Sequence, residues 1–90
     1  MKITVVGLWH LGTVTAACLA SSDHTVIGLD TDSNVINDLT EGRTPIFEPG
    51  LEKLVKKGLS EKHLNFTTNT TQALYDAEIV WITYDTPVDD

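Results

Sequence analysis

A short glycine-containing segment near the amino terminus has the residue types and spacing of an anion-binding turn. Residues 7–12 read Gly-Leu-Trp-His-Leu-Gly, between a β-branched run at residues 3–6 and an alanine-rich stretch at residues 11–20. The run is typical of a buried strand and the stretch is typical of a helix. Backbone N–H groups at the start of a helix attract negative charge. A turn between such elements can therefore bind the pyrophosphate of a dinucleotide.

The glycines depart from the standard G-x-G-x-x-G turn at one position. In that turn the first glycine allows the tight bend, the second lets the pyrophosphate approach the backbone, and the third lets helix and strand pack closely. Gly7 and Gly12 occupy the first and third positions, whereas Trp9 occupies the second. Three interpretations stay open: the indole plugs the cofactor groove, it stacks on a base or nicotinamide, or the two glycines serve only turn and packing.

An aspartate stands where a dinucleotide site needs an acidic residue. Asp30 follows a second β-rich run at residues 25–29 and lies 23 residues after Gly7. A carboxylate at this position accepts hydrogen bonds from ribose hydroxyls and repels a 2′-phosphate, which favours NAD over NADP. Taken alone, such an aspartate is also typical of a helix cap or a turn. Strand, turn, helix, strand and acidic residue in register together indicate an NAD site.

These residues require a parallel sheet that brings the ends of separate strands together. Strands are predicted at residues 3–6, 25–29, 64–67 and 78–83, and helices at 11–20, 33–41 and 51–57, with a fourth, short helix that runs through Leu74 and is capped within residues 68–71. Asp32 or Ser33 is expected to cap the second helix, and Gly58 to end the third. Strands that alternate with helices imply a parallel sheet with right-handed crossovers. The expected fold class is α/β: a Rossmann-like parallel sheet of about four strands with flanking helices, the first half of a dinucleotide-binding fold, in one partial domain at residues 1–90.

Length and composition limit the classes of protein to which the chain can belong. The 90 residues are 41% hydrophobic and 21% charged, which is ordinary for one small globular domain. The formal net charge of -7 and the lack of any run of Lys or Arg argue against a nucleic-acid partner. The apolar stretches are too short to span a bilayer, and the amino terminus lacks the long hydrophobic segment of a signal peptide. A cytoplasmic setting is expected, with no membrane partner.

The single cysteine, Cys18, excludes an intramolecular disulfide and a multi-cysteine zinc site. The three histidines are too far apart in the predicted structure to suggest a metal site. Leu11 and Val14 share one face of the first helix with Cys18, so we expect Cys18 to be a small buried core residue and not a nucleophile. Trp81, inside the fourth strand, is also expected in the core. We therefore assign no catalytic residue and no metal ligand.

Four segments together resemble the UDP-glucose/GDP-mannose dehydrogenase family, N-terminal NAD-binding domain. Residues 1–12 are similar to the family's first strand and Gly-x-Gly-Tyr-Val-Gly turn, and residues 14–20 to its alanine-rich helix. Residues 42–51 resemble its Gly-x-x-Pro-Ile-x-Glu-Pro-Gly-Leu segment, which is far more specific than a glycine pattern. Thr86-Pro87 resembles the family's Thr-Pro loop. The resemblance covers essentially the whole sequence.

The resemblance implies a function of which these residues carry only the first part. Enzymes of the family oxidise the C6 hydroxyl of a nucleotide sugar to a carboxylate, passing two hydrides to NAD through a thioester on a catalytic cysteine. The resemblance implies that the backbone of the turn faces the pyrophosphate, that Asp30 holds the adenosine ribose, and that Thr86 lies beside the cofactor. The cofactor-binding residues expected on this basis are Gly7, Trp9, His10, Leu11, Gly12, Asp30 and Thr86. The family's catalytic cysteine, its lysine and its nucleotide-sugar domain have no counterpart here.

Three residues differ from the family pattern and keep a second hypothesis open. Trp9 replaces the second glycine, His10 the usual tyrosine, and Val35 a lysine or arginine near the adenosine. The first hypothesis is the NAD-binding part of a nucleotide-sugar dehydrogenase, which meets its nucleotide sugar only in the full-length enzyme. The second is a non-catalytic Rossmann-like binding or interaction module whose cofactor groove is obstructed by Trp9.

The edge of the predicted sheet bears on self-association. The strands that complete a dinucleotide-binding fold have no counterpart after the fourth strand, so that strand is expected to leave an exposed edge. Exposed edges present unpaired N–H and C=O groups that pair with other chains. We therefore expect a homo-oligomer that forms through the exposed sheet edge.

Overall fold

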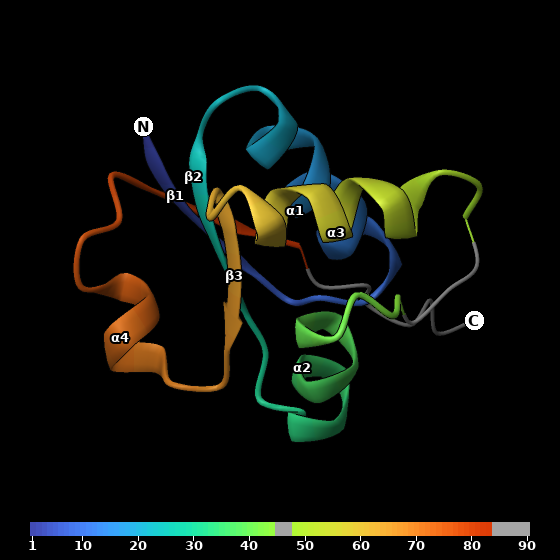
Figure 1. The fold of residues 1–90 in the computed structure, drawn as a ribbon. Helices are drawn as coiled ribbons and strands as arrows, with labels where there is room; N and C mark the ends of the chain where they lie inside the picture. Colours follow the sequence, from blue (N-terminus) through green and yellow to red (C-terminus); the bar gives the residue numbers. More distant parts are fainter. Residues whose placement is uncertain (45–47, 84–90) are drawn as a thin grey trace, which may run out of the picture.

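The computed structural model describes residues 1–44 and 48–83, with the backbone alone for His10. This part of the chain forms a four-stranded parallel sheet in the order β3-β2-β1-β4, with helices on both sides (Figure 1). The strands are β1 (Lys2–Val6), β2 (Thr25–Leu29), β3 (Leu64–Thr67) and β4 (Ile79–Ile82). The helices are α1 (His10–Ser21), α2 (Ser33–Thr40), α3 (Leu51–Ser60) and α4 (Thr70–Leu74). Element order and sheet type confirm the predicted Rossmann-like α/β fold.

The two faces of the sheet carry different layers. Helices α1, α2 and α3 lie on one side of the sheet, and α4 lies on the other (Figure 1). Successive strand residues point to opposite faces. Ile3 and Val5 of β1 and Val26 of β2 point toward α1 and are buried in the main core. On the other face the hydroxyl of Thr4 donates a hydrogen bond to the carbonyl oxygen of Ala73 in α4.

Helix α1 packs on the sheet through its small residues. Ala16, Ala17 and Ala20 are buried, whereas Leu11 is 52% exposed and Cys18 is exposed. The predicted core face through Leu11 and Cys18 is therefore wrong, and Cys18 is not a core residue. Alanine side chains let the helix approach the sheet closely, so the densest packing turns the alanine face inward and leaves Leu11 at the helix start in solvent.

Strand β4 lies at one edge of the sheet. It pairs with β1 on one side, and the described residues place no strand on its other side. All four of its apolar side chains are exposed, and Trp81 is 47% exposed. The prediction that Trp81 lies in the core is therefore wrong, because an edge strand lacks the second neighbour that would cover it.

Two helix ends were expected from the sequence. The side chain of Asp32 caps α2 by accepting a hydrogen bond from Asn34 N–H at 2.9 Å, as predicted. Gly58, in contrast, does not end α3, which continues to Ser60. A Cβ at Gly58 would lie 2.9 Å from Leu64 Cβ. This glycine therefore serves the close packing of α3 on β3.

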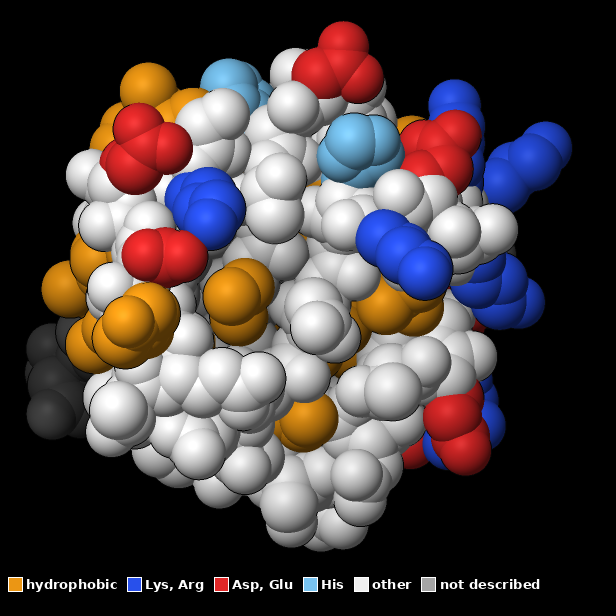
Figure 2. All heavy atoms as spheres, turned by 60° about the vertical axis from the view of Figure 1, so that its left-hand side comes forward, with side chains coloured by type: hydrophobic (Ala, Val, Ile, Leu, Met, Phe, Trp, Pro, Cys, Tyr) orange, Lys and Arg blue, Asp and Glu red, His pale blue; other side chains and the backbone are white. Residues whose placement is uncertain are grey.

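The face of the molecule shown in Figure 2 carries charged side chains of both signs. Figure 2 shows Lys, Arg, Asp and Glu side chains interspersed along its upper and right-hand parts, with apolar side chains between them. Among residues 1–44 and 48–83, no group of three or more His, Cys, Asp or Glu side chains is placed to hold a metal ion. None of the described helices has the length and apolar character needed to cross a membrane.

Candidate functional site

The glycine turn connects the carboxyl end of β1 to the amino end of α1. Gly7 has φ +90°, which side chains with a Cβ rarely allow, and its N–H donates to Leu29 O at 2.9 Å. Trp9 immediately precedes the helix, whose first backbone hydrogen bond runs from Thr13 N–H to Trp9 O at 3.1 Å. The N–H groups of residues 10–12 therefore stand at the start of the helix, where an anion can accept from them.

Gly12 allows α1 to approach the turn. A Cβ at this position would overlap the carbonyl oxygen of Gly7 and would lie 2.6 Å from Thr83 Oγ1. The atom in the way at Gly7 belongs to the backbone and cannot rotate aside. The close packing of strand and helix expected for the third glycine of the turn is therefore present here.

Asp30 lies against the glycine turn. Its Oδ2 accepts a hydrogen bond from Leu8 N–H at 2.9 Å, and its Oδ1 accepts one from Asp32 N–H at 2.9 Å. An ionised carboxylate has about four lone-pair sites, so these two bonds leave acceptor capacity on both oxygens. The residue predicted to hold a ribose is thus placed directly beside the turn predicted to hold a pyrophosphate.

Two further threonines, Thr13 and Thr83, also hold the turn. The buried hydroxyl of Thr13 donates to Leu8 O at 2.9 Å. The hydroxyl of Thr83 donates to Gly7 O at 2.7 Å, and Thr83 N–H donates to Val6 O at 2.8 Å. The available signal for Thr83 was a polar residue directly after the apolar run of β4. Such a residue stands at the carboxyl edge of the sheet, where ligands of this fold class bind.

Trp9 lacks the positive φ that would call for glycine. Its φ of -78° is open to any residue with a Cβ, and its side chain is 51% exposed. The second glycine of the standard turn serves the approach of the ligand, so tryptophan here changes the surface offered to the ligand and leaves the fold of the turn intact.

A hollow of about 230 Å³ opens beside Asp30 on the α4 side of the sheet. Its walls come from the carboxyl ends of β1 and β2, from β4 and from α4, and are formed by Val6, Leu29, Asp30, Thr31, Thr70, Leu74, Val80 and Ile82. Trp9 is not among these residues, so the indole does not fill this hollow. Small-molecule sites usually measure about 300–1,000 Å³, so the hollow suits one part of a dinucleotide and not the whole.

The other predicted site residues lie at or beyond the margins of this arrangement. The backbone of His10 begins α1, and Leu11 follows with its side chain exposed. Thr86 lies outside the described residues. Val35 is partly buried and packs against the main core. The structure thus brings together Gly7, Trp9, Gly12 and Asp30, with the backbone of residues 10–11 next to them.

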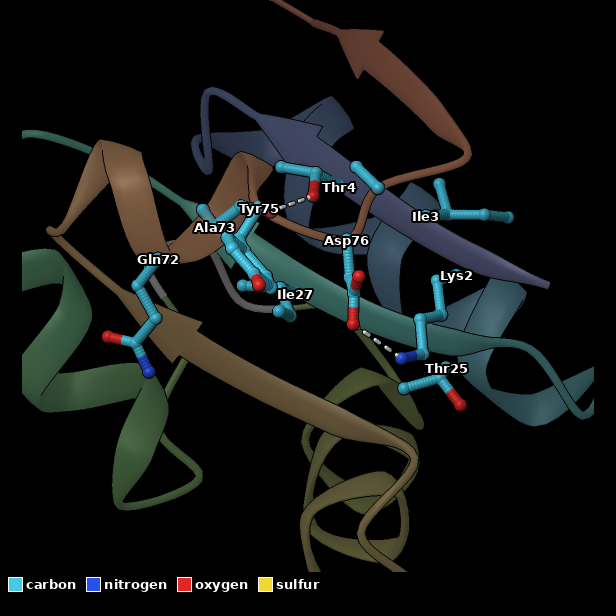
Figure 3. A pocket seen from close by; sticks show the side chains of 10 residues that line it. Lys2, Ile3, Thr4, Thr25, Ile27, Gln72, Ala73, Tyr75 and Asp76 are labelled. Atoms are coloured by element: carbon cyan, nitrogen blue, oxygen red, sulfur yellow. Dashed lines mark hydrogen bonds and ion pairs between the residues drawn. The ribbon is translucent and has the colours of Figure 1, made fainter.

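A second hollow, of about 220 Å³, lies at the amino ends of β1 and β2 beneath α4 (Figure 3). Lys2 Nζ and Asp76 Oδ2 form an ion pair in its wall at 2.9 Å. The hydrogen bond from Lys2 to Asp76, together with the attraction of that charge, raises the pKa of Lys2 from its ordinary value of 10.5. Ligands of open α/β sheets bind at the carboxyl ends of the strands. The arrangement around Asp30, at the opposite end, is therefore the candidate site.

Known sequences that match this chain belong to one family of dehydrogenases. The UDP-glucose/GDP-mannose dehydrogenase family, NAD binding domain, matches residues 1–90. UDP-glucose 6-dehydrogenase YwqF of Bacillus subtilis is 40% identical over 87 residues, which are 97% of this chain and 20% of that protein. GDP-mannose 6-dehydrogenase of Pseudomonas aeruginosa is 39% identical over 87 residues, with the same coverage of 97% and 20%. The chain thus spans about a fifth of the length of these curated relatives.

Solved structures that resemble this chain come from the same family. A ternary complex of GDP-mannose dehydrogenase from Pseudomonas aeruginosa superimposes with a TM-score of 0.95 at 38% identity, covering 99% of this chain and 20% of that one. UDP-D-ManNAc dehydrogenase from Pyrococcus horikoshii gives a TM-score of 0.92 at 34% identity, covering 99% and 21%. The resemblance inferred from the glycine turn and from residues 42–51 is therefore confirmed, and the chain belongs to the UDP-glucose/GDP-mannose dehydrogenase family, matching its NAD binding domain.

Proposed function

We propose that the chain binds NAD across the carboxyl ends of β1 and β2, as the cofactor-binding part of a nucleotide-sugar 6-dehydrogenase. The observation that carries the proposal is the 2.9 Å hydrogen bond from Leu8 N–H to Asp30 Oδ2. It fixes an acceptor for ribose hydroxyls next to the start of α1. Pyrophosphate and ribose are neighbours in NAD, and the proximity of Asp30 to the start of α1 supports the proposal that these two groups bind them.

Each residue of the site then has a defined role. The N–H groups of residues 10–12, together with the positive end of the α1 dipole, attract the pyrophosphate. Gly7 and Gly12 give the turn its shape, and Asp30 accepts from the ribose while its charge disfavours a 2′-phosphate. Thr86 is proposed to lie beside the cofactor on family resemblance alone.

The activity of the whole protein is proposed from its family. A nucleotide sugar, UDP- or GDP-linked as in the two relatives above, would be oxidised at its C6 hydroxyl to a carboxylate, with two hydrides passed to two molecules of NAD and one water consumed. Residues 1–90 would supply the NAD site as a partial domain, and the nucleotide sugar would bind only in the full-length enzyme. A nucleotide cofactor and a lone cysteine both suit the reducing cytoplasm, where we place the protein.

Trp9 supports a second candidate, a non-catalytic Rossmann-like module. A half-exposed indole stands where the pyrophosphate of a standard site meets glycine. If the indole blocks that approach, the fold persists as a binding or interaction module without the cofactor.

Calorimetric titration of the 90-residue chain with NAD tests both candidates. We expect a dissociation constant below about 1 mM, which corresponds to about 4 kcal/mol, and binding of NADP at least tenfold weaker. The variant Trp9→Gly restores the standard turn and is the matched comparison. Absence of NAD binding by the wild type, with binding gained in Trp9→Gly, would establish the obstructed module. Absence of binding by both would refute the NAD site.

A further inference from the structure

One peptide group in the glycine turn is held from two sides. The carbonyl oxygen of Gly7 accepts from the hydroxyl of Thr83 at 2.7 Å, and the N–H of Leu8 donates to Asp30 Oδ2 at 2.9 Å. These two atoms belong to the same planar peptide unit, whose C=O and N–H point in opposite directions. The side chains that hold it come from the ends of β2 and β4, which flank β1 in the sheet. One rigid plane therefore links three neighbouring strands.

This peptide group needs such support. Gly7 has φ +90° and no Cβ, so its own conformational preferences do little to fix the orientation of the next peptide plane. Thr83 is 5% exposed, and its N–H donates to Val6 O at 2.8 Å, so the threonine is itself fixed to β1. The space for its hydroxyl exists because Gly12 lacks a Cβ, which would lie 2.6 Å from Thr83 Oγ1.

The orientation of the peptide sets the orientation of Asp30. With the observed plane, Leu8 N–H faces Oδ2 and attracts it. With the plane turned over, the carbonyl oxygen of Gly7 would face the carboxylate, and the two negative groups would repel each other. The hydroxyl of Thr83 lies 2.7 Å from Gly7 O and 3.3 Å from Val6 O, so it donates mainly to Gly7 O and favours the arrangement in which that carbonyl points toward β4.

We propose that Thr83 is a positioning residue of the NAD site, which acts through the Gly7–Leu8 peptide to orient the carboxylate of Asp30. The expected effect on NAD affinity rests on the proposed function, whereas the orientation of Asp30 through the Gly7–Leu8 peptide does not. The hydrogen bonds of Thr83 go to Gly7 O and Val6 O and not to Asp30. Its effect on the cofactor passes through a peptide group that it shares with Asp30.

The test compares three variants. Thr83→Val removes the hydroxyl and keeps the shape, whereas Thr83→Ser keeps the hydroxyl. Thr4→Val is the matched control, because Thr4 is also buried and its hydroxyl also donates to a backbone carbonyl, that of Ala73 at α4, away from the turn. Two quantities are measured: the Leu8 amide proton resonance in the cofactor-free protein, and the dissociation constant for NAD.

In Thr83→Val, we expect the Leu8 amide resonance to move upfield, because the N–H loses its aligned carboxylate acceptor. NAD should bind roughly 2- to 12-fold more weakly, the range of one net hydrogen bond. Thr83→Ser should restore both quantities, and Thr4→Val should change neither, although its thermal stability should fall about as much as that of Thr83→Val. A merely structural role for Thr83 predicts the stability loss alone.

Two outcomes would overturn the inference in distinguishable ways. If Thr83→Val leaves the Leu8 amide resonance unchanged, the peptide does not transmit the effect of the hydroxyl, and the inference is refuted whether or not NAD binds. If the resonance moves but wild-type protein does not bind NAD, the proposed function and its dependence on Thr83 both fail, while the orientation of the peptide by Thr83 stands. Should Thr83→Val not fold, Thr83→Cys carries a weaker donor and should give intermediate values of both quantities.

Discussion

Replacement of Gly12 by alanine tests the geometry of the turn most directly. The added Cβ would overlap the carbonyl oxygen of Gly7 and lie 2.6 Å from Thr83 Oγ1. Overpacking of this kind costs about 1–3 kcal/mol, and alanine recovers roughly 0.5–1 kcal/mol relative to glycine within a helix. The obstructing carbonyl belongs to the backbone and is itself hydrogen-bonded, so we expect an overpacking cost near the upper end of that range. After the gain from alanine, the free energy of unfolding should fall by about 2 kcal/mol.

Thermal unfolding followed by circular dichroism measures this loss. For a domain of this size, 1 kcal/mol corresponds to about 4–8 °C in Tm, so Gly12→Ala should unfold about 8–16 °C below wild type. The matched control is Gly58→Ala, the same exchange inside α3. There the nearest atoms are Leu64 Cβ at 2.9 Å, which moves only with the backbone of β3, and Leu64 Cδ2 at 3.2 Å, which can rotate aside, so the overlap is smaller than that with Gly7 O.

The comparison between the two variants decides the outcome. Gly58→Ala should lower the free energy of unfolding by about 1 kcal/mol or less, clearly less than Gly12→Ala does. A Gly12→Ala protein as stable as Gly58→Ala would refute the argument that α1 meets the turn at van der Waals contact and that only glycine fits there.

Two further predictions concern the carboxylate and the sheet edge. Asp30→Asn should weaken NAD binding by roughly tenfold or more, because a hydrogen bond to a charged group contributes about 1.5–3 kcal/mol. It should also reduce the preference for NAD over NADP, because the neutral amide does not repel a 2′-phosphate. Unchanged affinities for both dinucleotides in calorimetry would contradict this role of Asp30. The exposed apolar edge of β4 should make the chain a dimer or larger in light scattering, and Ile82→Lys, at a side chain 63% exposed, should make it monomeric. A wild-type monomer at all concentrations would contradict self-association through this edge.

The strands were predictable because their signals are local. Runs rich in β-branched and other apolar residues, bounded by glycine, aspartate or polar residues, gave residues 25–29 and 64–67, and the structure has Thr25–Leu29 and Leu64–Thr67. The partner of Asp30 and the role of Thr83 were not predictable in this way. Thr83 and Gly7 are 76 residues apart in sequence, and no local pattern records which hydroxyl meets which carbonyl.

The two wrong predictions of core residues also arise from contacts between residues that are distant in sequence. Residue type and local periodicity predict a core position for Cys18 and Trp81, which the structure shows to be wrong. The orientation of α1 is set instead by the close fit of its alanines on the sheet, and the exposure of Trp81 is set by the place of β4 in the strand order. Both depend on neighbours that become adjacent only in the folded chain.

The hydrogen bond between Thr83 and Gly7 can form only after synthesis has reached residue 83. The turn at Gly7 leaves the ribosome early and can meet β2 as soon as residues 25–29 have emerged, whereas its second support arrives 76 residues later. In a nascent chain that still lacks β4, the loop proposed to bind the cofactor would thus be held from one side only. The closing of the longest-range strand pairing, a late and entropically costly step, would convert that loop to its rigid form. Ligand affinity should accordingly report completion of the sheet.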